Sequence, residues 1–353
     1  MSEVKDNHYV PRLYLRNFTD DPSAENGRFD LFNLGSGKHI GVVPHAPQMK
    51  ERYFYEKGSE IETRLGQEFE GKHATLIRDL LENNSTPSSS SLLEIILLMH
   101  FRTRAQRNED LFFRRHMIDQ YMDYLVSSFK SHLRKKLWIF AKLINDKIIR
   151  AIVKQGAYEQ YLKKTDSSAK QIKNFDRIRS EMTGLECVVL DNPNSIHLFS
   201  SDRPVLLLNP FLQRKKVNFG KDGMFQMGIL LILPISPEKL LVCYDPDIYE
   251  NPHAISSGKL SQNDVEKLNR LQIQCGVEAI YSRTLPQNIE LLVAEVLSQK
   301  KLPQIITVDL PGDYQLTYKK SNLSNYSFDF LKEKSGTDSI RLRLPYGRPE
   351  ALV

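Results

Sequence analysis

The sequence predicts an α+β fold: short N-terminal β elements, a helical middle, and a C-terminal mixed or antiparallel sheet with flanking helices. Three patterns indicate this fold: a strand–turn–strand pattern in residues 28–44, helical spacing of apolar residues through much of 60–182, and short apolar runs bounded by Pro, Asn, Asp and Gly after residue 184. With 353 residues, 41% of them hydrophobic and 26% charged, the composition is typical of a soluble globular protein. We expect regions 1–59, 60–183 and 184–353 to form one interlocked unit.

The first half of the chain is expected to hold one hairpin and four helices. RFDLFNL and GVVP are predicted strands, joined by the turn LGSGKHI. Ser91 is the expected cap of the helix that begins at Leu92, with Glu94 at the capping-box position. Apolar spacing predicts helices over Glu60–Glu82, Leu92–Ser128, Phe129–Gln155 and Ser168–Met182.

The second half carries strand signals. CVVLD, IHLFS, PVLLLN, MGILLILPI and KLLVCYD are short apolar or alternating runs, and we expect them in one sheet. Helices are predicted over Ser261–Tyr281 and Asn288–Leu302, followed by the strands QIITVDL and YQLTYK.

Positive charge is concentrated in the middle of the chain. Residues 101–181 contain 19 Lys or Arg against 9 Asp or Glu, a local net charge of +10 in a chain whose total is +6. A positive face attracts phosphate groups whatever the base sequence. Arg134, Lys135 and Lys136 are therefore candidate nucleic-acid contacts. The alternative is a solvated helical surface that acidic neighbours balance in space.

Cysteine usage and hydropathy favour a cytoplasmic protein that does not contact the membrane. Cys187, Cys243 and Cys275 are widely separated in apolar or amphipathic runs, so we expect buried free thiols in a reducing compartment. The longest apolar run, Leu92–Phe101, is about half a membrane span. No apolar N-terminal stretch resembles a secretion signal.

The segment HYVPRLYLRNF, from His8 to Phe18, places cationic and aromatic groups between hydrophobic anchors. If Tyr14 and Phe18 point inward, His8 and Arg12 could face a shared cleft. Histidine is the side chain most ready for proton transfer near neutral pH, so His8 is a candidate general base or metal ligand. The alternative is a structural plug, in which the polar groups satisfy backbone carbonyls.

Two further motifs supply candidate site residues. Asp202, in SSDRP, is predicted on the turn between two strands, where a carboxylate is held rigidly and can reach a substrate. Alternatively, Asp202 makes an Asx-turn and caps its own loop. In HFRTRAQR, the residues His100, Arg104 and Arg107 would share one helix face, and the arginines could clamp phosphate groups. Alternatively, they pair with the acids of the Glu60–Glu82 helix.

The cofactor is left open, with a divalent metal such as Mg²⁺ as the candidate. Glu60, Glu62, Glu68 and Glu70 could contribute carboxylate ligands. Acidic residues at the start of a helix also simply suit its dipole, and we favour that explanation. The sequence contains no phosphate loop, GxSxG, HExxH or dinucleotide fingerprint.

The HYVP segment resembles the opening signature of a bacterial family named Domain of Unknown Function 4238. The resemblance continues at SSDRPV (200–205), LPISPEKLLVCYDP (233–246) and LNRLQIQCGVEAIYS (268–282), and so covers about four-fifths of the chain. A helix that bears arginines near residue 104 is also part of the resemblance. The family name carries no activity.

Charge and motifs together predict a protein that acts on DNA or RNA. The first hypothesis is a nuclease-like effector of the kind that acts in phage defence. His8 and Asp202 would be catalytic, while Arg12, Arg104 and Arg107 would hold phosphates. A second hypothesis is a non-catalytic sensor that binds a nucleotide or nucleic-acid end and signals to a partner protein. A third is a purely structural member of a complex.

Overall fold

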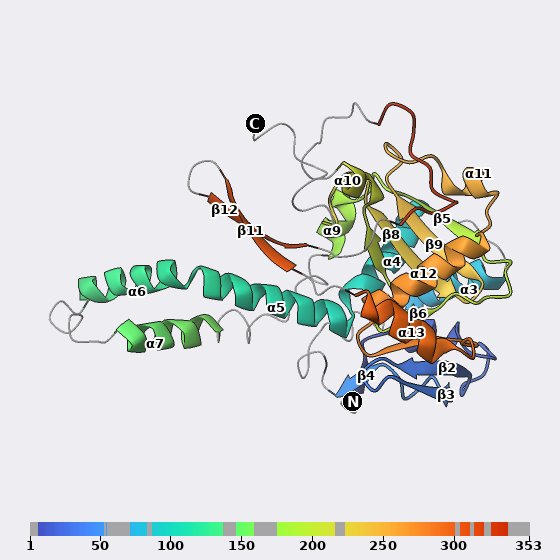
Figure 1. The fold of residues 1–353 in the computed structure, drawn as a ribbon, viewed down its shortest axis with the longest axis horizontal. Coiled ribbons are helices and arrows are strands. Elements are labelled where there is room, and N and C mark those ends of the chain that lie inside the picture. The colour runs from blue at the N-terminus through green and yellow to red at the C-terminus, as the bar shows by residue number, and fades with distance from the viewer. Residues whose placement is uncertain are drawn as a thin grey trace.

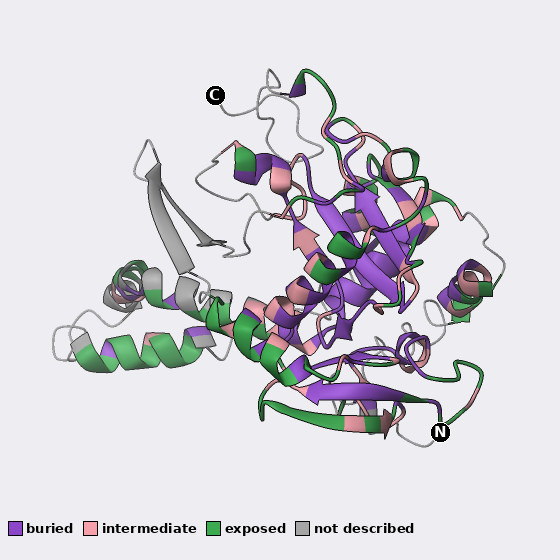
Figure 2. Ribbon diagram, turned by 45° about the vertical axis from the view of Figure 1, so that its right-hand side comes forward, coloured by how far each residue is buried: buried purple, intermediate pink, exposed green. Residues whose placement is uncertain are grey.

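The computed structural model describes residues 6–52, 54, 71–82, 87–136, 146–158, 175–215, 223–300, 304–310, 314–320 and 326–337. Within these residues the chain forms an α+β body, and three helices project from it as an arm (Figure 1). The predicted fold class is confirmed. Figure 2 shows buried residues gathered in the body and exposed residues along the arm.

The main sheet contains four antiparallel strands in the order β5-β9-β8-β7: β5 (Glu186–Asp191), β9 (Lys239–Tyr244), β8 (Leu230–Ser236) and β7 (Leu206–Leu208). All seven residues of β8 are buried, because helices cover both faces of the sheet. Leu231 and Leu233 pack in the core that contains α4 (Ser89–Phe101), while Leu230 and Ile232 pack in the core that contains α12 (Gln262–Cys275). Burial on both sides explains the continuous apolar run of this strand.

A second antiparallel sheet has the order β3-β2-β10-β6: β3 (Lys38–Pro44), β2 (Arg28–Asn33), β10 (Ala279–Ser282) and β6 (Ser200–Ser201). The predicted hairpin is confirmed as β2 and β3. Two expectations are wrong here. The run IHLFS contributes only its last residue to a strand, in this sheet and not the main one, and residues 279–282 form β10 where a helix was expected.

Helix α4 differs from its prediction at both ends. Ser88, not Ser91, is the N-cap, and its side chain accepts a hydrogen bond from the Ser91 backbone N–H. Glu94 is then too far along to close a capping box. It is buried and forms ion pairs with Lys72 (2.7 Å) and with Arg179. These partners come from α3 (Gly71–Glu82) and α9 (Phe175–Glu181), so Glu94 ties both helices to α4.

The expected single helix over 92–128 is also wrong, because residues 102–103 interrupt it and a separate helix, α5 (Arg104–Gln120), follows. Helices α5, α6 (Met122–Lys136) and α7 (Asp146–Tyr158) form the arm (Figure 1). The arm has its own small core, which includes Ile118, Met122, Val126 and Ile149. The expected helix over 129–155 is divided between α6 and α7, with 137–145 outside the described residues.

Shorter elements complete the described chain. Strands β1 (Asp6–His8) and β4 (Lys50–Arg52) pair antiparallel, and the predicted final strands are confirmed as the hairpin of β11 (Gln304–Leu310) and β12 (Tyr314–Lys320). The remaining helices are α1 (Arg12–Arg16), α10 (Pro210–Arg214), α11 (Pro252–Ser256) and α13 (Ile289–Ser298). None of the helices among the described residues is long and apolar enough to cross a bilayer.

The expectation of three free thiols is wrong for two of them. Cys187 and Cys243 are direct partners in the β5–β9 register and form a disulfide. Cys275 keeps its thiol. Because disulfides are rare in a reducing cytoplasm, the cysteines no longer support a cytoplasmic location, which stays a prediction.

Candidate functional site

Sequence motifs that lie far apart along the chain meet at the base of the arm. The Tyr9 hydroxyl donates a hydrogen bond to Glu278 Oε2 (2.5 Å), and Arg104 Nη1 donates to Glu278 Oε1 (2.6 Å). Arg104 Nε also lies 3.2 Å from Glu51 Oε2. One carboxylate, Glu278, therefore joins the HYVP segment to the first turn of α5. Burial and the neighbouring Glu278 carboxylate both raise the pKa of Tyr9, so its hydroxyl stays protonated.

Asp202 lies beside this network and holds the start of β10. Its Oδ1 accepts hydrogen bonds from the backbone N–H groups of Val277 (3.0 Å), Glu278 (3.0 Å) and Ala279 (3.2 Å). The side chain is buried, and its Oδ2 has no hydrogen-bond partner among the described residues. Burial raises the pKa of Asp202, although the three N–H groups act in the opposite direction. The carboxylate thus fixes a different segment and does not cap its own loop.

Most of the chain matches the model of one protein family. The family model described as "Protein of unknown function (DUF4238)" matches residues 6–285, more than half of the sequence. The chain belongs to this family. No curated protein and no solved structure matches it. The resemblance to DUF4238 inferred from the sequence motifs is confirmed, and the match spans every residue of the network at the base of the arm.

His8 and Arg12 of this DUF4238 protein use their polar atoms elsewhere. His8 Nε2 donates to the Ala46 carbonyl (2.9 Å), and the His8 carbonyl accepts a hydrogen bond from Arg102 Nη2 (2.7 Å). Burial lowers the pKa of His8, and the charges of Arg102, Lys50 and Arg12 lower it further, so the ring is neutral at pH 7. With Nε2 carrying the proton, Nδ1 is the nitrogen that could accept one.

Arg12 points to the loop that follows α1. Its Nη2 donates to the Glu25 carbonyl (3.2 Å) and lies 4.0 Å from the Glu25 carboxylate. The side chain is 41% exposed. Arg12 therefore has room to meet a ligand, but its hydrogen bond does not belong to the network around Glu278.

The other predicted phosphate clamp, Arg107, fastens α5 to the body. Its Nη1 donates to the Phe54 carbonyl (2.8 Å), and its guanidinium lies 5.0 Å from the centre of the Phe54 ring. Two residues further along α5, Glu109 forms a two-pronged ion pair with Arg203, the residue after Asp202. Arg104, Arg107 and Glu109 thus attach the first two turns of α5 to different parts of the body.

His100 does not share a helix face with the two arginines, because the break at residues 102–103 leaves it on α4. It is buried near Arg203 and Glu109. Burial and the positive charge of Arg203 lower the pKa of His100 to about 3. It is a neutral core residue at any ordinary pH.

Several candidate side chains lie outside the described residues. The side chains of Arg134, Lys135 and Lys136, at the end of α6, lie outside the described residues, as do Glu60, Glu62, Glu68 and Glu70. In the part of the chain that the structure describes, no three His, Cys, Asp or Glu side chains lie close enough together to hold a metal ion.

Sequence reasoning missed Glu278, the residue that joins the network. It was assigned to the helix predicted over Ser261–Tyr281, although the apolar contacts that indicate this helix end at Cys275. Gly276 was the available signal, since glycine commonly follows the last residue of a helix. The helix does end at Cys275, with Gly276 as its C-cap.

Proposed function

We propose that this protein binds nucleic acid through its helical arm and acts as a sensor that passes the binding event to a partner protein. The observation that carries the proposal is the concentration of positive charge on a projecting part of the fold (Figure 1). Helices α5, α6 and α7 contain 11 Lys or Arg against 5 Asp or Glu, a net charge of +6. Since the whole chain carries +6, the remaining residues are neutral in sum.

The charge is strongest away from the body. Helices α6 and α7 contain 7 Lys or Arg against 2 Asp or Glu. On α7, Lys147, Arg150 and Lys154 are exposed and follow one another at helical spacing, so they form one basic stripe. Lys154 also forms an ion pair with Asp119 of α5 (2.8 Å), which holds α7 against α5. A projecting basic surface attracts a polyanion at long range and gives salt-dependent binding.

The base of the arm supports a role in transmission better than a role in chemistry. Arg104 and Arg107, which were expected to clamp phosphates, instead contact Glu278, Glu51 and Phe54. The Glu278 carboxylate in turn accepts a hydrogen bond from Tyr9, and the Glu278 backbone N–H donates to Asp202. A ligand that shifts the arm would act directly on these contacts.

The test is a salt titration of DNA and RNA binding by the full chain. Affinity should fall steeply from about 50 to 200 mM salt, and replacing Arg134, Lys135 and Lys136 with Ala should reduce the log–log slope by about 2–3. The matched control replaces three exposed lysines of the body, Lys38, Lys259 and Lys334, with Ala. It removes the same charge and should leave the slope nearly unchanged. Equal effects of the two triple variants, or no binding at low salt, would refute the proposal.

A second candidate function, phosphodiester cleavage, is favoured by one observation: the buried Asp202 Oδ2 lacks a hydrogen-bond partner among the described residues, and the pKa of this carboxyl is raised. Such a group could transfer a proton. Asp202→Asn should then reduce cleavage by roughly 100-fold or more while binding is retained. If the wild-type protein cleaves no DNA or RNA across divalent metals such as Mg²⁺, the sensor is the better description.

A further inference from the structure

Exposed aromatic rings occur on only one part of the described fold. Phe112 (58% exposed), Tyr121 (38%) and Tyr124 (72%) are the exposed aromatic residues among those described, and all three belong to the arm. The body buries its rings instead, as Tyr14, Phe18 and Tyr281 show. The arm thus exposes aromatic rings on helices whose net charge is +6.

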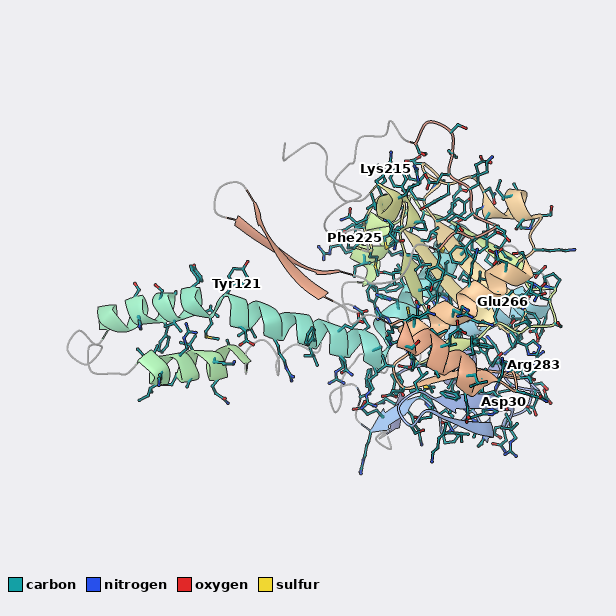
Figure 3. The ribbon with its side chains drawn as sticks, viewed as in Figure 1. Asp30, Tyr121, Lys215, Phe225, Glu266 and Arg283 are labelled. Carbon is teal, nitrogen blue, oxygen red and sulfur yellow. A yellow bond between two sulfur atoms is a disulfide. The ribbon has the colours of Figure 1, made fainter. Side chains whose placement is uncertain are left out.

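The placement of the rings suits contact with a ligand. Tyr121 lies at the junction between α5 and α6 (Figure 3). The Leu125 N–H donates to the Tyr121 carbonyl (3.0 Å), the i to i+4 bond of a helix, so Tyr124 lies on the same side of the arm as Tyr121, about 4.5 Å further along. Phe112 comes nine residues earlier, about 14 Å along the helix axis. Since Tyr121 and Tyr124 are neighbours, they can present their rings to successive units of one chain.

We infer that the arm binds single-stranded nucleic acid, with bases stacked on Tyr121 and Tyr124 and phosphates held by the basic residues of α6 and α7. This inference rests on the proposed function and names its substrate class. Proteins that bind single strands combine positive charge along the backbone with aromatic rings on which the bases stack. A duplex offers the same phosphates, but its base faces are already stacked within the helix. The positive charge alone would bind both forms, and the exposed rings should make the arm prefer the single strand.

A second copy of the chain is the competing occupant of these rings. Dimerisation through the arms would bring together two surfaces that each carry a net +6, and like charges oppose such an approach. A polyanion meets no such repulsion. The rings and the charge therefore point to the same ligand.

The experiment compares the full chain and its variants on an oligo(dT) strand of about 20 nucleotides, longer than a typical single-strand site, and on the same strand paired with oligo(dA). The wild type should bind the single strand more tightly. Tyr124→Ala should weaken single-strand binding by roughly 5- to 100-fold, whereas Tyr124→Phe should retain most of it because the ring remains. Tyr121→Ala should act in the same direction.

The matched control is Ile152→Ala, which removes an apolar side chain of similar exposure (52%) from the same arm but no ring. It should leave single-strand binding nearly unchanged. Three results together would overturn this inference and leave the proposed function standing. Single strand and duplex would bind equally, Tyr124→Ala would not change binding, and the variant of Arg134, Lys135 and Lys136 would still bind more weakly. Absence of binding to either nucleic acid would overturn both. If Tyr124→Ala instead converts a dimer to a monomer without changing affinity, the rings form a contact between copies.

Discussion

Asp202 is the residue whose replacement best separates a structural from a chemical role at the base of the arm. Asp202→Ala removes the acceptor of three backbone hydrogen bonds, from the N–H groups of Val277, Glu278 and Ala279. Hydrogen bonds to a charged group contribute about 1.5–3 kcal/mol each to stability, and leaving a buried N–H unsatisfied costs about 1–3 kcal/mol. Because the three bonds share one acceptor, they will not add fully. We expect a loss of about 3–4 kcal/mol in the free energy of unfolding.

Asp202→Asn is the matched control for this loss. The amide oxygen can replace Oδ1 as the acceptor, and the amide nitrogen would take the place of Oδ2, which has no hydrogen-bond partner among the described residues. We therefore expect Asp202→Asn to cost clearly less than Asp202→Ala, on the order of 1–2 kcal/mol for one unsatisfied amide group. Urea denaturation of both variants, followed by circular dichroism, measures the difference. Equal losses would show that the charge matters, not the accepted hydrogen bonds, and would refute this reasoning.

The pH dependence of the same pair gives an independent check. Burial raises the pKa of Asp202 above its ordinary value of 3.8, so the folded protein binds this proton more tightly than the unfolded chain does. The cost of holding the ionised group is relieved as pH falls through the raised pKa. The wild type should therefore gain stability relative to Asp202→Asn as the pH is lowered towards 3.8, and a change of the opposite sign would contradict the assignment.

Three further predictions concern the surroundings of this site. In a double-mutant cycle, Arg104→Ala and Glu278→Gln should show a coupling of about 0.5–1 kcal/mol, since both side chains are more than a third exposed; additive effects would mean that the pair contributes nothing. Reducing the disulfide between Cys187 and Cys243, which lie 56 residues apart, should lower the free energy of unfolding by about 2–4 kcal/mol, measured by urea denaturation with and without dithiothreitol. Because burial lowers the pKa of His100 to about 3, the unfolded chain takes up this proton first, and His100 should reduce stability as pH drops below about 6.5. Its share of the loss at pH 5.5 should be about 1.4 kcal/mol, measured by urea denaturation as the difference between the pH profiles of the wild type and of His100→Leu.

The sequence predicted the parts of the fold that depend on local signals. The hairpin of β2 and β3 was found because Gly35 and Gly37 mark its turn, and Gly37 does adopt a positive φ of 67°. The strands β8 and β9 were found because both are short apolar runs bounded by turn residues. The fold class followed from the order of these local elements.

The features that were missed depend on which segments meet in space. The break at residues 102–103 carries neither proline nor glycine, so nothing in the spacing separates α4 from α5. The disulfide requires the register that places Cys187 opposite Cys243, which no local pattern encodes. At the candidate site, Arg104 and Asp202 were named from the sequence and Tyr9 lies in the HYVP segment, but the place of Glu278 in the network depends on the pairing of β10 with β2.

The order of strands in the second sheet has a consequence for how the protein is made. Leu31 of β2 pairs with Tyr281 of β10, so about 250 residues separate the two strands along the chain. At a synthesis rate of about 5–20 residues per second, roughly 12–50 s pass between the emergence of one strand and of the other. During that time the edge of β2 that β10 will occupy has no partner from that strand, and unpaired strand edges promote aggregation. We expect the yield of folded protein during expression to depend strongly on chaperones and on temperature. The free energy of unfolding of the finished protein should depend on them less.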